Sequence, residues 1–318
     1  MTIQDSGWNL MARLFALPII VLFVLALTCL AQNNSRPIRI ALLDFGNSPN
    51  GRRVADWLAE AMSSNSRATT NRDDALQVID RDWTRAAAFG TGYRGSLNLT
   101  LPEARDLGSA IGCDFFFTGK AGTERRSPAD GPPYFESYTA IYLVSARTGK
   151  LTLWEWHSAK GPTPEAAENT LLQEVVAQDA LYRYRRQIQR ARENEQAERA
   201  SAIENNVPVI EVLSDDQSNA GNGVQAPRPY RRLKPPYPDT AARAEIEATV
   251  DVLVDIDARG EVGRVEVARW AGYGLDQSVV DTVRQLHFFP AQRDGAAIPI
   301  RVLLRYNFRK PPVQTRSQ

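Results

Sequence analysis

The residues that could do chemistry are few. His157 and His287 are the only histidines of the chain, and neither has a second ligand at the spacing of a metal site. A closed zinc site takes three or four protein ligands, so we interpret both histidines as structural, with His287 capping carbonyls at a helix end. No Ser/His/Asp or Cys/His set emerges, because two histidines leave little choice of base. We therefore expect no catalytic residue, no bound metal and no enzyme.

One segment has the spacing of a dinucleotide fingerprint. Gly90, Gly92 and Gly95 give G-x-G-x-x-G in the run GTGYRG. The fingerprint holds a pyrophosphate only when a strand precedes it and a helix begins after it. Here a helix-like pattern precedes the glycines, and residues 96–101 follow without a helical pattern. No cofactor is therefore expected.

Three aspartates fall on one face of a predicted strand. Asp251, Asp255 and Asp257 could together suggest a cation site. Arg259 and Arg264 are close in sequence, and a solvated, charge-balanced face is the favoured interpretation.

A run of arginines could indicate nucleic acid. It extends over residues 183–199 and is interleaved with Glu193, Glu195 and Glu198. This pattern favours a solvated helix. The net charge of +1 also gives no strong field that would select nucleic acid or an acidic surface. Neither nucleic acid nor a small-molecule substrate is expected.

The bulk composition is that of a globular protein. The chain has 318 residues, of which 43% are hydrophobic and 24% charged. This length is sufficient for two ordinary domains with connecting segments.

The N-terminus carries an export segment. Residues Leu14 to Ala31 are uncharged and follow a short segment that ends in Arg13. Three fates stay open for residues 1–31: cleavage before Gln32, retention as a membrane anchor, and lipidation at Cys29, although Ala26 and Thr28 depart from the lipoprotein pattern. Each fate places the rest of the chain in the periplasm, with the hydrophobic segment as the expected tether to the inner membrane.

The other cysteine lies in an apolar run. Cys113 stands between Ile111 and Phe115 and has no disulfide partner if Cys29 is removed with the leader. We expect a small buried apolar side chain.

The elements that must position these residues begin with an α/β domain over residues 38–157. Short apolar runs predict strands, and apolar residues at helical spacing predict helices. The expected strands are Ile38–Phe45, Ala75–Asp80, Cys113–Gly119, Tyr134–Ala146 and Leu151–His157, and the expected helices are 54–64, 83–89 and 102–112.

A long helix and a linker follow. Residues 164–206 have a helical pattern that becomes almost wholly polar beyond Ile188. Residues 207–228 form a flexible linker by composition, which is most polar over Ser214–Gly223.

The last part of the chain, residues 229–310, predicts a second domain. Residues Thr249–Asp257 alternate, with Val250, Val252, Val254 and Ile256 on one face, as in a strand with one solvated face. The expected order is a short helix ending near Ala244, strands Thr249–Asp257 and Val262–Ala268 joined at 258–260, a helix Leu275–Phe288 ended by Pro290, and a strand Ile298–Phe308.

This order and its junctions resemble the TonB C-terminal domain. The matching residues are Tyr237-Pro238, Val250 to Ile256, Gly260, Leu275-Asp276, Phe289-Pro290-Ala291, Gly295 and Asn307-Phe308. Glu245 and Ala248 depart from the resemblance, because the family usually has glycines before the first strand. The resemblance implies an α+β protein of two domains whose C-terminal αββαβ domain has a three-stranded antiparallel sheet.

The resemblance also implies a partner and a binding mode. In this family the domain binds a short extended peptide of an outer-membrane receptor plug, which adds as a strand to an exposed sheet edge. The edge would be the last strand, with the site residues Ile300, Arg301, Val302, Leu303, Leu304, Arg305 and Tyr306. The alternative is that Arg301 and Arg305 only keep an exposed edge soluble.

The first domain resembles, more loosely, the periplasmic α/β domains of the CsgG and TolB N-terminal type. The segments that carry this resemblance are Ile38–Phe45 with its helix, Val78–Arg81 and Ala104–Gly119. It implies an α/β sandwich-like domain that assembles or binds at the envelope.

Two functional hypotheses follow. The first is a TonB-family envelope protein that binds receptor peptides and transduces energy from an ExbB/ExbD-type proton-driven motor in the inner membrane. The second is a non-coupled periplasmic scaffold that uses the domain only for protein binding. Residues Leu14–Ala31 lack the Ser-x-x-x-His pattern by which TonB engages its motor, and a globular domain replaces the long Pro-rich tether, which favours the scaffold. A homodimer is left open.

Overall fold

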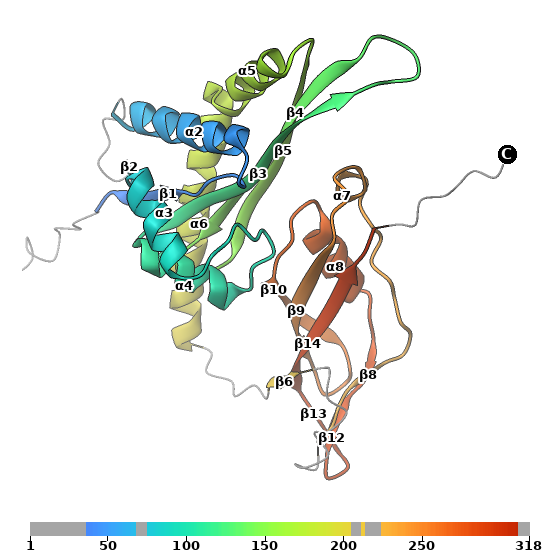
Figure 1. The fold of residues 1–318 in the computed structure, drawn as a ribbon. Coiled ribbons are helices and arrows are strands. Elements are labelled where there is room, and N and C mark those ends of the chain that lie inside the picture. The colour runs from blue at the N-terminus through green and yellow to red at the C-terminus, as the bar shows by residue number, and fades with distance from the viewer. Residues whose placement is uncertain (1–35, 68–74, 205–210, 214–223, 311–318) are drawn as a thin grey trace, which may run out of the picture.

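The computed structural model describes residues 36–67, 75–204, 211–213 and 224–310. The predicted leader, residues 1–31, and the polar stretch Ser214–Gly223 lie outside these ranges. Within them, no helix is long and apolar enough to cross a membrane. The fold is the mixed α+β arrangement expected from the sequence, with one main sheet in each half of the chain and two small sheets in the C-terminal half (Figure 1).

The N-terminal half is built on a five-stranded sheet in the order β2-β1-β3-β4-β5. Its first three strands are parallel and its last three are antiparallel. The strands are β1 (Ile38–Leu42), β2 (Leu76–Val78), β3 (Phe115–Arg126), β4 (Tyr134–Ser145) and β5 (Leu151–Gly161). β5 continues beyond the predicted end at His157, because its ladder with β4 extends to the pair Phe135↔Gly161.

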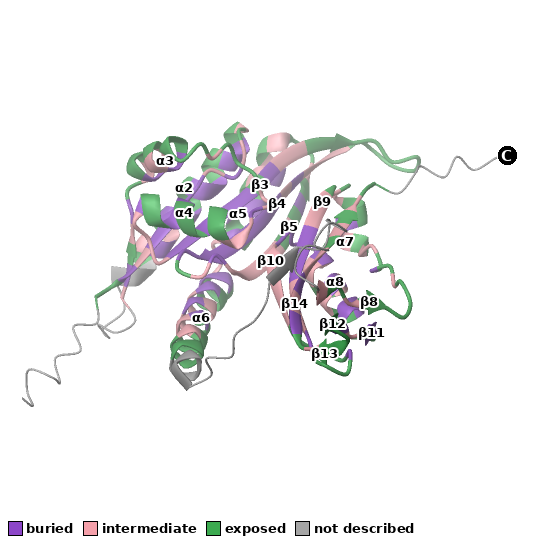
Figure 2. Ribbon diagram, turned by 90° about the horizontal axis from the view of Figure 1, so that it is seen from below, coloured by how far each residue is buried: buried purple, intermediate pink, exposed green. Residues whose placement is uncertain are grey.

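Both faces of this sheet are buried, which explains its nearly continuous apolar strands. Phe115 and Phe117 point into a core formed with helices on one face, while Phe116 points into a second core on the other face. The first face is covered by α2 (Pro49–Arg67), α5 (Pro164–Val175) and α6 (Gln178–Glu204), and the second by α3 (Arg81–Gly90) and α4 (Leu101–Ile111). Figure 2 shows the buried strands between these exposed helix surfaces.

Helix α4 has the caps that its sequence requires. Thr100 and Glu103 form a reciprocal capping box, and Pro102 stands in the first turn. Gly112 ends the helix at φ 77°.

The single long helix predicted over residues 164–206 is wrong. The chain forms two helices, α5 and α6, and is interrupted at Val176 and Ala177 between them. Val175 and Leu181 are both buried against the same sheet, so a change of direction between the helices keeps both apolar faces on the core.

The C-terminal half has the predicted antiparallel sheet β10-β9-β14, to which a fourth strand, β6, is added. The strands are β6 (Glu211–Leu213), β9 (Ala248–Ile256), β10 (Val262–Arg269) and β14 (Ile300–Phe308), and helices α7 (Asp239–Arg243) and α8 (Leu275–Val283) accompany them. Short ladders join β7 (Val224–Gln225) to β12 (Ala291–Arg293) and β13 (Ala296–Ile298), and β8 (Arg228–Pro229) to β11 (Phe288–Phe289).

Helix α8 is shorter than the predicted Leu275–Phe288. It ends at Val283 with Arg284 as its cap, and Phe288–Phe289 instead forms a strand with β8. The predicted inner residues Leu275, Val279, Val283 and Leu286 are all buried. His287 therefore does not cap the helix: its Nδ1 lies 2.9 Å from a carboxylate oxygen of Glu261.

The departure noted at Glu245 has a backbone cause. Glu245 has a φ of 52°, in the left-handed region that favours glycine. The turn before β9 therefore has a backbone conformation that glycine adopts more easily than Glu245 does.

Candidate functional site

Strand β14 pairs with β9 along its whole length. The register runs from Ile300↔Ile256 to Phe308↔Ala248. Because side chains alternate along a strand, this register divides the predicted site residues between two faces of the sheet.

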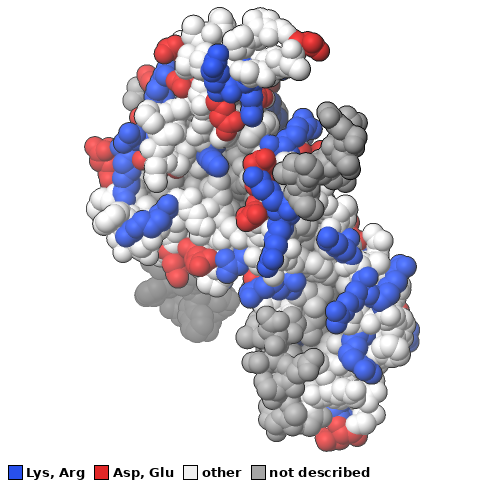
Figure 3. Space-filling view, turned by 45° about the vertical axis from the view of Figure 1, so that its right-hand side comes forward, with Lys and Arg blue, Asp and Glu red and all other residues white. Residues whose placement is uncertain are grey.

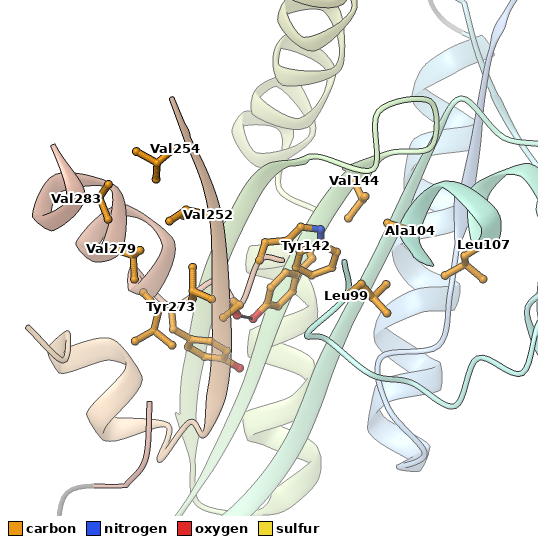
Figure 4. Packing of buried hydrophobic residues seen from close by; sticks show 14 of the residues in the cluster. Leu99, Ala104, Leu107, Tyr142, Val144, Val252, Val254, Tyr273, Val279 and Val283 are labelled. Carbon is orange, nitrogen blue, oxygen red and sulfur yellow. Dashed lines mark hydrogen bonds between the residues drawn. The ribbon is translucent and has the colours of Figure 1, made fainter. Parts of the chain in front are cut away.

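One face of β14 belongs to the core. Ile300 and Val302 are buried, and Leu304 and Tyr306 pack partly buried against the same cluster. This cluster includes the inner valines of β9 and the apolar side of α8, which face each other in Figure 4. These side chains anchor the strand to the domain.

The other face of β14 carries the two arginines, and each pairs with an aspartate on β9. Arg305 Nε donates to Asp251 at 2.8 Å, and Arg301 donates to Asp255 at 2.8 Å. Arg269 also binds Asp251 at 3.2 Å, and only 5% of the Asp251 side chain is exposed. These aspartates therefore form cross-strand ion pairs with Arg269, Arg301 and Arg305. The expected solvated face is wrong at Asp251, which these pairs bury.

Asp257, the third aspartate of the row, serves the hairpin turn. Its carboxylate accepts hydrogen bonds from the backbone N–H of Arg259 and Glu261 at 2.8 and 2.9 Å. The backbone hydrogen bond from Glu261 is the main cause that lowers the pKa of Asp257. No group of three or more potential metal ligands occurs among residues 36–67, 75–204, 211–213 and 224–310.

The outer side of β14 is not bare. Strand β6 lies along it in parallel, with Glu211, Val212 and Leu213 in register with Arg301, Val302 and Leu303. Figure 1 shows β6 beside β14 at the edge of the sheet. The register of β6 ends at Leu303, and β9 is the described strand that pairs with Leu304–Phe308.

The domain that carries β14 is packed against the N-terminal sheet. Trp270 is 1% exposed; its ring lies 5.6 Å from that of Tyr142, and its Nε1 donates to the Gly149 carbonyl at 3.0 Å. The Tyr142 hydroxyl donates to the Ala271 carbonyl at 2.9 Å. Because Tyr142 belongs to β4, the loop after β10 and the first sheet share one buried core.

Asn98 connects the ends of two strands of the second sheet. Its Nδ2 donates to the carbonyls of Thr249 and Trp270, both at 2.8 Å, and its Oδ1 accepts from the Thr249 N–H at 3.1 Å. The Trp270 N–H also donates to the Leu99 carbonyl. The connection between α3 and α4, which contains the glycine-rich run, therefore positions β9 and β10.

Asp276 holds the contact loop from within. Its carboxylate accepts the N–H groups of Ala271 and Gly272 at 2.8 and 2.9 Å. Burial raises the pKa of Asp276 to about 6, although these two hydrogen bonds favour the ionised form. The loop that carries Trp270 is thus tied to the N-terminus of α8.

A cleft of about 460 Å³ separates the two sheets beside this contact. It is lined by β5 residues such as Thr152 and Trp154 and by β10 residues such as Arg264 and Val265. An ion pair crosses it, because Lys150 Nζ lies 3.2 Å from Glu266. The cleft lies between β5 and β10, away from the β14 edge.

The C-terminal domain also carries exposed basic residues. Arg228, Arg231, Arg232 and Lys234 are exposed on the segment that contains β8. Figure 3 shows several Lys and Arg side chains over this domain on the face that comes forward.

The glycine-rich run, His157 and Cys113 each contact residues that hold the fold together. The G-x-G-x-x-G run follows helix α3 and leads into the contact segment at Asn98, not into a helix N-terminus. His157 Nε2 lies 3.0 Å from Glu155, which also binds Arg183 of α6. Burial raises the pKa of Cys113 to about 12, and its thiol faces the Gly108 carbonyl.

The sequence did not indicate Asn98 or Trp270, and it gave Asp276 only as a matching family residue without a role. Each acts through partners more than a hundred residues away or through a loop whose conformation is set by packing. The run Trp270 to Gly274, in which aromatic residues alternate with small ones, was the available signal, because close backbone approach needs small residues beside large ones.

Each of three solved structures is similar to part of the chain. The solution structure of the Pseudomonas aeruginosa TonB C-terminal domain is 20% identical, covers 33% of this chain and 97% of its own, and has a TM-score of 0.25. A lipoprotein from Neisseria meningitidis is 16% identical, with 45% and 99% coverage and a TM-score of 0.31. A hypothetical protein from Chlamydia trachomatis is 12% identical, with 45% and 96% coverage and a TM-score of 0.31.

The sequence families give a more local result. No curated protein matches the chain. One family model does match, that of the Gram-negative bacterial TonB protein C-terminal, over residues 234–309. The αββαβ order and the antiparallel sheet of this segment agree with that match. Residues 234–309 therefore form a TonB C-terminal domain.

Proposed function

We propose that this chain is an envelope protein of the bacterial periplasm that binds extended peptides of outer-membrane receptors at strand β14. The family match of residues 234–309 supports a protein-binding role. The observation that carries the proposal is the outer side of β14, where a parallel strand of three residues is already paired with Arg301–Leu303. An edge that pairs with one extended segment can supply backbone hydrogen bonds to another.

The two faces of β14 suit this role. Ile300 and Val302 fix the strand in the core, so the edge is rigid before a peptide arrives. Arg301 and Arg305 stand on the opposite face and are partly exposed, with 27% and 45% of each side chain accessible. They keep a free edge soluble and offer positive charge to an acidic residue of the peptide.

The test is a proline at the edge. The N–H of Asp257 points to the β10 side, so alternation along β9 and its register with β14 direct the N–H of Leu304 toward β9 and that of Asn307 outward. Asn307→Pro therefore removes an outward-facing donor from β14 beyond the register of β6, and we expect loss of pull-down of receptor plug peptides. Val265→Pro, on β10 at the opposite edge of the same sheet, is the matched control and should keep binding. Circular dichroism checks that both variants are folded. Undiminished binding by Asn307→Pro would contradict the assignment of the edge.

A non-coupled scaffold is the second candidate. Trp270 is buried against the N-terminal domain, so the docking domain is fixed to a globular neighbour and does not stand free at the end of a tether. This arrangement holds a peptide at a set position and needs no motor.

The fate of the leader discriminates between the two candidates. A mature protein whose N-terminal sequence begins at Gln32 contradicts a membrane-anchored transducer. Recovery in the inner membrane with Met1 retained contradicts a soluble scaffold. Either result leaves the peptide-binding edge to be tested separately.

A further inference from the structure

Strand β6 comes from the segment before the C-terminal domain and pairs with the edge that a peptide would use. Glu211–Leu213 follow α6 in the chain and precede β7, yet they form the outermost strand of the second sheet. Their register with β14 is parallel, with Glu211 beside Arg301 and Leu213 beside Leu303.

We propose that β6 is an internal competitor for the β14 edge, so that a docking peptide binds only by displacing it. This inference rests on the proposed function of that edge. One side of a strand can form a ladder with only one neighbour at a time. Occupation by β6 and occupation by a peptide at Arg301–Leu303 therefore exclude each other.

The length of β6 suits a displaceable strand. It pairs over three residues, which gives few backbone hydrogen bonds. Because β6 belongs to the same chain as β14, its effective concentration at the edge is high, and such concentrations reach the millimolar range when two binding segments are linked closely. A strand with weak intrinsic affinity can thus occupy the edge most of the time and still yield to a longer partner.

A docking peptide can pair with more of β14 than β6 does. Strand β6 is in register with Arg301–Leu303, whereas β14 extends from Ile300 to Phe308. A peptide that pairs along all of β14 forms a longer ladder than β6 does, which favours exchange.

The register also indicates what the competing peptide should carry. Glu211 is the residue in register with Arg301, whose guanidinium is bound to Asp255 and remains partly exposed. An acidic residue followed by apolar residues therefore reproduces the sequence of β6 at this position. Such a peptide should compete better than one with lysine in place of the acid.

The experiment removes β6 as a strand and offers it back as a peptide. In the full chain purified in detergent, Val212→Pro with Leu213→Pro removes two adjacent donors, of which one must face β14 because successive N–H groups alternate in direction. The probe is a fluorescent peptide with the sequence of residues 208–216. The control has Gln217→Pro with Ser218→Pro, outside the strand.

We expect the β6 variant to bind the probe on the order of fivefold more tightly than the wild-type chain, because apparent affinity is reduced by the fraction of chains with a free edge. The control should bind the probe like the wild-type chain. Equal affinity of all three proteins would overturn the proposal. Receptor plug peptides that bind the wild-type chain and the β6 variant equally would also overturn it while leaving the proposed function intact. If the probe binds the β6 variant more tightly but no receptor plug peptide binds any of the proteins, the competitor role of β6 is supported and the proposed function is contradicted.

A disulfide gives a second test within one protein. Glu211→Cys with Arg301→Cys places thiols on register partners of neighbouring strands, whose separation of ~4.8 Å is within the range for a disulfide. Oxidation should weaken the affinity for the probe at least tenfold, and reduction should restore the affinity. Since Arg301 is absent in both redox states, the change reports the position of β6 alone. Binding unaffected by oxidation would contradict the competitor role.

Discussion

At Trp270 the indole fills space between the two sheets, and its N–H is bonded to the Gly149 carbonyl. Trp270→Ala should lower the free energy of unfolding by about 3–5 kcal/mol, the usual cost of deleting a buried aromatic side chain. Phe89→Ala is the control, because Phe89 is 69% exposed and should cost less than about 1 kcal/mol. Urea unfolding measures both, and equal losses would show that Trp270 is not a packing centre.

Asp276 predicts a pH dependence. Burial raises its pKa in the folded protein to about 6, above the value of 3.8 expected for an unfolded chain. The folded state therefore binds the proton more tightly, and the contribution of this group is fully present below pH 4 and is lost as the pH rises through 6. The shift corresponds to ~3 kcal/mol at most.

The measurement is urea unfolding between pH 4 and pH 7. Asp276→Asn should flatten the decline of stability across this window, because the amide does not ionise. Asp281→Asn, an exposed change on the same helix, should leave the decline as in the wild-type chain. A decline of the same slope in Asp276→Asn would show that another group causes it.

Two aspartates of unequal burial form the ion pairs of strand β9. The Asp251 side chain is 5% exposed and binds two arginines, while Asp255 is 33% exposed and binds one. Asp251→Asn should lower the free energy of unfolding by about 2–3 kcal/mol, because it removes the buried carboxylate that binds both Arg269 and Arg305. Asp255→Asn should cost about 1 kcal/mol or less. Urea unfolding of the two variants measures both losses. Equal losses of unfolding free energy would contradict the role assigned to the burial of Asp251.

Local patterns were sufficient for the elements of the C-terminal domain. The valines of β9 alternate and are all buried, and the inner residues of α8 were correctly identified. The end of α8 was wrong because Phe288 and Phe289 pair with β8, a partner that helical periodicity cannot show. The solvated face expected for the aspartates was wrong at Asp251, which is buried, because its arginine partner on β14 is set by a register that joins residues about fifty apart.

The whole molecule contains contacts that no local pattern indicates. β6 was assigned to a flexible linker from composition, yet three of its residues extend the second sheet. The burial of Trp270 between the two halves likewise depends on how the two domains meet. Short strands and interfaces of this kind are stabilised by contacts with residues distant in sequence, so a local sequence pattern does not predict them.

The shared core predicts that both halves unfold together. Gly272 has a φ of 74°, and a Cβ there would lie 2.6 Å from the ring and hydroxyl of Tyr142, so Gly272→Ala should force the contact loop away from the first sheet. Scanning calorimetry should show one transition for the wild-type chain and two for this variant, because the coupling between domains is lost. Gly95→Ala is the matched control: its φ is also positive, at 88°, but a Cβ there meets nothing within 4 Å. It should lose about 1 kcal/mol from backbone strain and keep a single transition. A single transition in Gly272→Ala at the wild-type temperature would mean that the halves do not depend on this contact.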